Sequence, residues 1–297
     1  MSVSLRTFRK ARAMENALTI DVEEWYHLCG SGSLPEPAVK DRRVMKNIEA
    51  ILALLDEFGV RATFFMLGGV AEAEPTLAPL IAKAGHEIAS HGWSHRLVTT
   101  LTPEEFREEL RRTGDLLGQQ TGGRPIGFRA PQWSLGAVTP WAFEILREEG
   151  YRYDSSLNPL PFVGDRRGMR IPHRIAGGLL EFPPLVTPFP GVNLPTGGGW
   201  GFRFFPRFLV SGGIRALNEK GCPAVLYIHP REMDPDGPRT PLSPFKEFVV
   251  YGPRHSVADR LRPLLARYRF TTLECLADLW DTASSFRHTM PPQPSPP

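Results

Sequence analysis

Short apolar runs and longer stretches of helical spacing alternate along the first part of the chain. Residues 17–25 form an apolar run that ends in carboxylates and predicts a strand, in which Asp21 and Glu23 share one face because side chains alternate. Apolar positions then recur with three-to-four spacing over 41–58, which predicts a helix packed by one face. The nearly all-apolar run 61–67 predicts a buried strand parallel to the first.

The same alternation continues to residue 280. The segment T-P-E-E at 102–105 is typical of a helix N-terminus, with Thr as the cap and Glu placed to bond back to it. Further helices are expected at 76–84, 102–120, 140–149, 257–268 and 274–280, and further strands at 86–90, 126–130, 151–154, 224–229 and 270–273. Strands that alternate with helices predict a parallel sheet covered by helices, either a (β/α) barrel or an open doubly wound sheet.

The apolar spacing typical of helices is absent between residues 160 and 221, where Pro and Gly dominate. Such a stretch predicts a long excursion over the face of the sheet. Residues 1–17 are expected to be a polar tail and residues 283–297 a disordered Pro-rich tail. The chain of 297 residues is long enough for one sizeable core, so residues 18–282 are expected to form a single domain.

Composition narrows the possible function classes. The formal net charge is +3 with acidic and basic residues interspersed, so no strongly basic face indicates a nucleic-acid partner. Three cysteines without C-x-x-C spacing are interpreted as structural thiols: Cys29, Cys222 and Cys275. The basic N-terminus lacks the apolar core of a signal peptide, and no segment approaches the length of a membrane span. We therefore expect a cytoplasmic location, either free or peripheral to the inner membrane.

Two histidines follow the strand expected at 86–90. His91 and His95 are four residues apart, which puts both rings on one side of a helical turn or of a tight loop leaving a strand. The spacing alone fits a solvated pair equally well, and the pattern of the zinc proteases would need Glu where Gly92 follows the first histidine. The pair becomes a metal site only if carboxylates such as Asp21 and Glu23 complete it.

Other polar residues also fall at the ends of expected strands. Arg129 lies in F-R-A-P-Q-W-S, Asp154 in Y-D-S-S and His229 in L-Y-I-H-P. Taken singly, each has a structural explanation as an ion-pair partner, a turn cap or a hydrogen-bonded histidine. Both candidate architectures place their sites at the carboxyl ends of parallel strands, so the sequence indicates that these residues converge.

The ordered series D-x-E, H-x-x-x-H, R-x-P, Y-D-S-S and L-Y-I-H-P resembles the NodB-homology polysaccharide deacetylases, carbohydrate esterase family 4. The segments D-V-E-E-W, G-G-G-W-G-F-R and I-H-P-R-E are similar to those of deacetylases found with bacterial exopolysaccharide export loci. The resemblance extends over residues 18–279. It implies an α/β fold, a deformed (β/α) barrel of about seven strands.

The resemblance implies a metal centre and a base. His91 and His95 match the two metal-binding histidines, and Asp21 matches the catalytic base. The commonest first motif of the family, T-F-D-D-G, has its metal aspartate next to the base, but an apolar residue stands there in this chain. Glu23 is the expected third ligand because it shares a strand face with Asp21, and Glu24 is the alternative if the strand ends early.

Three further roles follow from the resemblance. Arg129 matches the arginine that holds the base, His229 the catalytic histidine, and Asp154 the acid that orients this histidine. Sugar-binding residues are expected among the prolines and aromatic side chains of the same motifs, with Pro131, Trp133 and Trp200 as candidates and Phe202 and Phe204 as further stacking surfaces.

The implied function is a metal-dependent N-deacetylase that hydrolyses the acetamide of N-acetylhexosamine units in a bacterial exopolysaccharide or its precursor. Zn²⁺ is the expected cofactor, with Co²⁺, Mn²⁺, Fe²⁺ and Ni²⁺ as other candidates, since two imidazoles and one carboxylate leave an open position for water. The expected partners are the N-acetylated glycan and the exopolysaccharide biosynthesis machinery. Two alternatives stay open: a small-molecule amide or cyclic ureide hydrolase of the allantoinase-like branch, and a non-catalytic glycan-binding or assembly protein.

Overall fold

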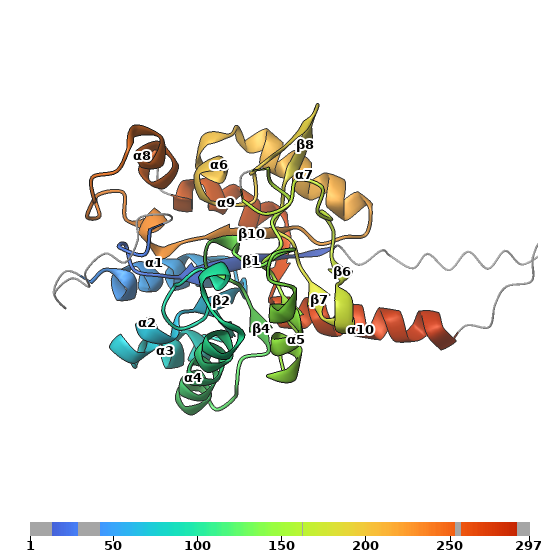
Figure 1. Cartoon of the computed structure of the whole chain (residues 1–297). Coiled ribbons are helices and arrows are strands. Elements are labelled where there is room, and N and C mark those ends of the chain that lie inside the picture. The colour runs from blue at the N-terminus through green and yellow to red at the C-terminus, as the bar shows by residue number, and fades with distance from the viewer. Residues whose placement is uncertain (1–13, 29–41, 162, 253–256, 290–297) are drawn as a thin grey trace, which may run out of the picture.

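The computed structural model describes residues 14–28, 42–161, 163–252 and 257–289 (Figure 1). The expected tails fall largely outside these ranges, as does Cys29. Of the other two cysteines, Cys222 is buried and Cys275 is partly buried, and both are free thiols. Among the described helices, none is both long and apolar enough to cross a bilayer.

A nine-stranded sheet forms the centre of the molecule, in the order β10-β1-β2-β3-β4-β5-β7-β6, with β11 also paired to β1. Its pairs are parallel except β6 with β7. The strand bounds are β1 Glu15–Val22, β2 Thr63–Met66, β3 Glu87–Ser90, β4 Gly127–Phe128, β5 Tyr153–Asp154, β6 His173–Arg174, β7 Leu180–Glu181, β10 Val225–Ile228 and β11 Arg269–Thr271. The expected parallel sheet is confirmed, and its curled shape confirms a deformed (β/α) barrel.

Helices cover the outside of this sheet (Figure 1). Their bounds are α1 Val44–Glu57, α2 Gly68–Ala73, α3 Leu77–Lys83, α4 Pro103–Thr121, α5 Pro140–Glu148, α6 Gly199–Phe204, α7 Arg207–Glu219, α8 Pro244–Tyr251, α9 Val257–Arg267 and α10 Leu273–Thr289. The expected cap of α4 is present, because the Thr102 hydroxyl accepts a hydrogen bond from Glu105 N and the Glu105 carboxylate accepts one from Thr102 N. The helix ends at Gly122, whose φ of 86° is left-handed.

The stretch expected as an irregular excursion contains regular structure. It adds β6 and β7 to the sheet, which raises the strand number above the expected value. It also forms a hairpin of β8 Thr187–Phe189 and β9 Val192–Leu194, followed by α6 and α7. Glycine and proline mark turns between these short elements rather than one long loop.

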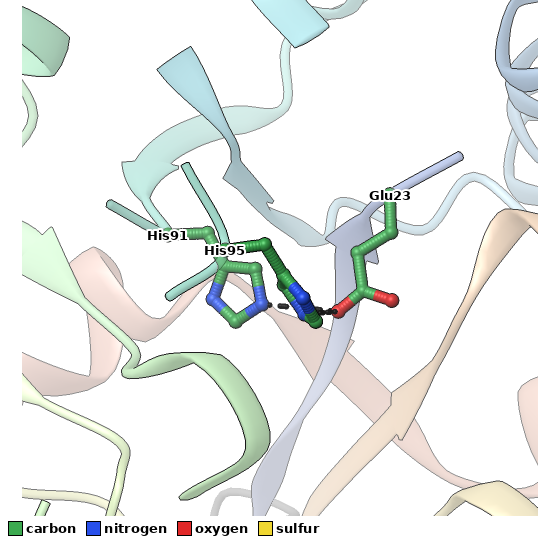
Figure 2. A group of neighbouring side chains, drawn as sticks. All are labelled: Glu23, His91 and His95. Atoms are coloured by element: carbon green, nitrogen blue, oxygen red, sulfur yellow. Dashed lines mark hydrogen bonds and ion pairs between the residues drawn. The ribbon is translucent and has the colours of Figure 1, made fainter. Parts of the chain in front are cut away.

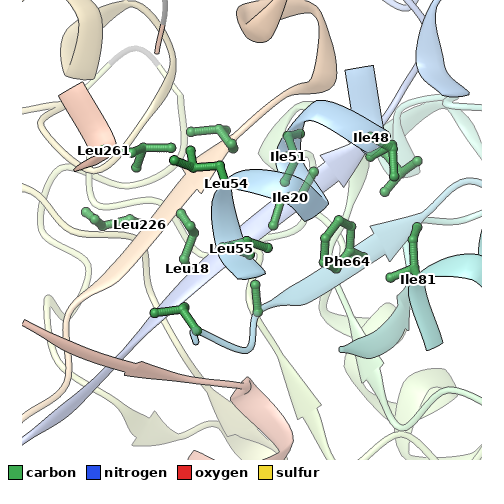
Figure 3. Close-up of a cluster of buried hydrophobic side chains, with 14 of the residues drawn as sticks. Leu18, Ile20, Ile48, Ile51, Leu54, Leu55, Phe64, Ile81, Leu226 and Leu261 are labelled. Atoms are coloured by element: carbon green, nitrogen blue, oxygen red, sulfur yellow. The ribbon is translucent and has the colours of Figure 1, made fainter. Parts of the chain in front are cut away.

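The alternation along β1 divides the interior into two environments. Leu18 and Ile20 point outward, where they pack with Leu226, Phe64 and Leu55 beneath the helices (Figure 3). Side chains of the opposite face, including Asp21, point into the barrel. The apolar face fixes the register of β1, and this register directs its polar face toward the site.

Candidate metal centre and acid–base site

Three ligand atoms meet where β1 and β3 end. Nε2 of His91 lies 3.2 Å from Oε1 of Glu23, and Nε2 of His95 lies 2.9 Å from the same oxygen (Figure 2). The three atoms lie within 4.8 Å of one another. Nδ1 of His91 is 2.7 Å from the carbonyl oxygen of Arg129, and this contact turns Nε2 toward Glu23. The arrangement fits a divalent cation held by two imidazoles and one carboxylate.

The backbone after β3 explains how the two histidines reach the same point. Gly92 adopts a φ of 77° and His95 a φ of 59°, so a tight loop, rather than a helical turn, brings the rings together. The carboxylate of Glu109 on α4 accepts hydrogen bonds from the N–H groups of Trp93, at 3.0 Å, and Ser94, at 3.4 Å. Glu109 therefore anchors this loop, a role that its helical position in the sequence does not reveal.

Glu23 reaches the histidines by a different route from the expected one. β1 ends at Val22, and a turn follows in which Glu23 N donates to Asp21 O at 3.0 Å. Strand alternation therefore does not apply to Glu23. Glu24 points elsewhere: its Oε1 accepts the N–H groups of Arg43, at 2.8 Å, and Val44, at 2.9 Å. This carboxylate satisfies backbone donors at the start of α1.

A buried ion pair lies beside the three ligand atoms. Nη1 of Arg129 donates to Oδ1 of Asp21 at 2.7 Å. The other nitrogens of the guanidinium donate to Ser155, Nε to the carbonyl at 3.0 Å and Nη2 to the hydroxyl at 2.7 Å. Oδ2 of Asp21 lies 3.9 Å from Nε2 of His229. Asp21 is thus held between a fixed cation and an imidazole.

The acid beside His229 is not the expected one. Oε2 of Glu232 accepts a hydrogen bond from His229 N at 2.9 Å and lies 3.4 Å from Nδ1 of the same residue. Oε1 of Glu232 lies 3.0 Å from Nε of Arg203. Burial opposes ionisation of Glu232, but the hydrogen bond with His229 and the charge of Arg203 outweigh it and lower its pKa to about 2. The spacing H-P-R-E is a capping-box pattern that could have indicated Glu232.

Asp154 supports the other side of the site. The Ser156 hydroxyl donates to Oδ1 of Asp154 at 2.5 Å, and the same hydroxyl accepts from Ala130 N at 2.8 Å. Burial raises the pKa of Asp154 to about 6, and burial with the neighbouring Asp154 charge raises the pKa of Glu181 well above its usual range. Our expectation that Asp154 orients His229 is thus corrected: Asp154 pairs with Glu181 and holds the segment that contacts Arg129.

His27, which the sequence did not single out, packs against the metal-site candidates. Its ring stacks on that of His95 with centroids 5.3 Å apart, and its Nδ1 accepts a hydrogen bond from Glu24 N at 3.1 Å. Burial and the neighbouring His95 lower the pKa of His27 to about 4, so the ring is neutral at physiological pH. His27 therefore holds His95 in place without adding charge.

The expected sugar-binding residues lie in three different places. Trp133 lies over the guanidinium carbon of Arg129, 4.9 Å from ring centroid to carbon, and Pro131 is buried in the same segment. Trp200 lies on α6, in an aromatic cluster with Phe204 and Phe248. Phe202 is buried in the core. Trp133 therefore contacts Arg129, the residue that pairs with Asp21.

Comparisons with known proteins agree with this fold. The polysaccharide deacetylase family model matches residues 41–153. The chain is 32% identical over 110 residues to a peptidoglycan deacetylase of Helicobacter pylori, covering 37% of this chain and 36% of the relative. It is 36% identical over 143 residues to a peptidoglycan-N-acetylglucosamine deacetylase of Bacillus cereus, covering 44% of this chain and 52% of the relative. Residues 41–153 thus match a polysaccharide deacetylase domain of the NodB-homology type, and the chain spans from a third to a half of these relatives.

The remainder of the chain has its own family model. Residues 155–278 match a domain of unknown function, DUF3473. The structure joins the two matched segments in one sheet, since β7 from the second pairs with β5 at the end of the first. Two solved structures have the same fold. A Mycobacterium smegmatis protein assigned to the polysaccharide deacetylases has a TM-score of 0.60 at 22% identity, covering 97% of this chain and 96% of its own. The Puue allantoinase has a TM-score of 0.63 at 16% identity, covering 93% and 92%.

Proposed function

We propose that the chain is a metal-dependent N-deacetylase that hydrolyses the acetamide of N-acetylhexosamine units in a bacterial exopolysaccharide or its precursor. The observation that carries this proposal is the convergence of Glu23, His91 and His95 beside the buried Asp21–Arg129 pair. Deacetylation is supported by the matching family model and by relatives that act as peptidoglycan deacetylases. The similarity of the segments D-V-E-E-W and I-H-P-R-E to deacetylases of exopolysaccharide loci supports the choice of glycan and an association with that machinery.

Each proposed step uses a group whose position is described above. Glu23, His91 and His95 would hold a divalent ion, most simply Zn²⁺, which when bound supplies an activated water and polarises the acetamide carbonyl. Asp21 accepts the proton of the attacking water, and its contact with Arg129 fixes the direction of its Oδ2 lone pairs.

The amine cannot leave until its nitrogen is protonated. His229 lies on the other side of Asp21 and donates this proton. The carboxylate of Glu232 faces Nδ1 of His229, so it fixes the orientation of the ring and leaves Nε2 directed toward Asp21. The products are acetate and a free amino group on the sugar.

Acetate release from N-acetylglucosamine oligomers and from an N-acetylated exopolysaccharide would test the proposal, together with metal analysis of the purified protein. We expect about one divalent ion per chain and a loss of at least about 100-fold in kcat for Asp21→Asn and His91→Ala. Release that is unchanged in either variant would contradict the mechanism. Hydrolysis of a cyclic ureide without acetate release would favour the allantoinase-like alternative, and glycan retention by a metal-loaded but inactive protein would favour a binding role.

A further inference from the structure

Several exposed phenylalanine side chains belong to elements that lie on one side of the molecule. Within the described residues, the phenylalanines with exposed side chains are Phe189, Phe204, Phe208, Phe245 and Phe248. They belong to β8, α6, α7 and α8, which follow one another along the upper edge of Figure 1, on the opposite side from α3 and α4. Large apolar side chains that collect on one surface mark a site of interaction.

The degree of exposure indicates the kind of surface. Phe245 is 77% exposed and Phe208 is 71% exposed, so both rings project from the protein. A sugar-stacking platform presents one ring face and rests the other on the protein. Projecting rings can instead enter the boundary between headgroups and acyl chains of a lipid bilayer, as in proteins that bind at the surface of a membrane.

Two arginine-rich grooves lie among these aromatic side chains. A groove of about 420 Å³ between α7 and α9 is lined by Phe208 together with Arg207, Arg215 and Arg267. A groove of about 470 Å³ at the β8–β9 hairpin is lined by Phe189 together with Arg166, Arg167 and Arg170.

Neither groove includes an Asp or Glu among the described residues that line it. Among the described residues, two polar contacts reach the guanidinium groups of these arginines, Glu219 at 3.8 Å from Arg215 and Asn193 at 3.4 Å from Arg170. Asp165 accepts the backbone N–H of Arg167 at 2.9 Å, and Asn193 Nδ2 donates to the carbonyl of Arg166 at 3.5 Å. The grooves therefore combine an exposed ring with several guanidinium groups, which suits a surface that presents phosphates above an apolar layer.

We propose that this basic aromatic face, formed by Phe189, Phe208, Phe245 and the six groove arginines, binds the surface of an anionic lipid bilayer. The rings enter the boundary between headgroups and acyl chains, and the guanidinium groups pair with lipid phosphates. Binding of this kind does not depend on deacetylation.

The face is also connected to the site. Gly198, directly before α6, pairs with Tyr227, which lies two residues before His229. Trp200 on α6 contacts Phe204 and Phe248. A membrane bound at this face therefore lies one short helix away from the strand that carries His229, so a glycan attached to a lipid would be presented near the site.

Vesicle flotation tests this proposal with the full chain. We expect the protein to float with vesicles of phosphatidylcholine mixed with phosphatidylglycerol, to bind vesicles of phosphatidylcholine alone at least about tenfold more weakly, and to be released by salt. The double variants Phe208→Ser with Phe245→Ser, and Arg166→Glu with Arg207→Glu, should each weaken binding by about tenfold or more.

The matched control lies on α3. Leu80→Ser with Lys83→Glu removes an exposed apolar side chain and a positive charge from the opposite side, and it should leave flotation unchanged. Thermal melting confirms that each variant is folded. Failure to float with either vesicle would overturn the proposal, as would equal flotation of all variants. Retention on an acidic polysaccharide without flotation would overturn it in favour of a glycan-binding surface.

Discussion

Oε2 of Glu232 lies 3.4 Å from Nδ1 of His229 and also accepts the backbone N–H of that residue at 2.9 Å. One carboxylate oxygen therefore fixes both the main chain and the ring of the candidate acid. Arg203 holds the other oxygen at 3.0 Å, so the carboxylate cannot rotate freely. Glu232 is a positioning residue for His229.

Replacing Glu232 should impair the chemical step and leave substrate binding intact. We expect Glu232→Gln to lower kcat by about tenfold to 100-fold with little change in KM, because a neutral amide holds the imidazole ring and Arg203 less firmly than the carboxylate does. Glu232→Asp should restore part of the activity. Steady-state kinetics on an N-acetylated oligomer measures both. Glu247→Gln, an exposed change on α8, serves as the control, and a rise in KM alone would contradict the positioning role.

Glu23 and Glu24 should differ sharply although they are neighbours. Glu23→Gln removes a charged oxygen from the group of three ligand atoms, so we expect metal content to fall at least about tenfold. Glu24→Gln should keep the metal and cost about 1 kcal/mol of unfolding free energy, because Glu24 accepts backbone N–H groups at the start of α1. Metal analysis and urea unfolding of both variants separate the two outcomes. Loss of metal in Glu24→Gln alone would reverse the assignment.

Arg129 should be required for both stability and activity. Its guanidinium is buried and donates to Asp21, Thr19 and Ser155. Arg129→Ala leaves a buried carboxylate without its cation, which costs about 3–5 kcal/mol in comparable cases. Arg129→Lys keeps the charge but loses the planar guanidinium that donates to several acceptors at once. We therefore expect a folded protein with kcat reduced about tenfold or more. Urea unfolding and acetate release test this, and wild-type kinetics in Arg129→Lys would contradict it.

A buried glutamate at the amino ends of the strands should make stability depend on pH. Glu87 accepts hydrogen bonds from Thr63 and Tyr153, both at 2.6 Å, and from Glu274 N at 3.0 Å. Burial raises its pKa from 4.5 to about 7. The folded state therefore binds this proton more tightly than the unfolded state, so its stabilising effect is complete below pH 4.5 and is lost as pH rises toward 7.

The expected loss over this interval is about 3 kcal/mol of unfolding free energy. Glu87→Gln should flatten the dependence, whereas Glu72→Gln, at an exposed pair with Arg112, should retain it. Urea unfolding at a series of pH values measures the effect. An equally steep decline in Glu87→Gln would show that another group is responsible.

Much of the fold could be predicted from the sequence because long apolar runs must be buried, and few arrangements of strands and helices bury them all. The runs that became β1, β2 and β10 are buried on the helix-facing side, and their ends determine where Asp21 and His229 lie. The short strands β6 and β7 escaped prediction because they lie in the Pro- and Gly-rich stretch between residues 160 and 221, where no apolar run marks them.

The site was harder to predict in its details than in its location. Glu23 reaches the histidines through a turn, which strand alternation cannot describe. Glu232 and Asp154 are both acids close to expected strand ends, and only the three-dimensional contacts show which of them faces His229. Glu109 and His27 support the histidine loop from other elements, so no spacing along the chain points to them.

The pairing of β1 with β10 has a consequence for synthesis of the protein. Glu23 contacts Arg231, two residues after the candidate acid, and 208 residues separate this pair. A chain growing from its N-terminus carries the proposed base and the metal-site candidates long before it carries His229. The site can assemble only when the second family segment has emerged and its strand β10 has paired with β1. This pairing is a long-range step that makes folding slow. Prematurely ended chains would therefore lack the proposed proton donor altogether.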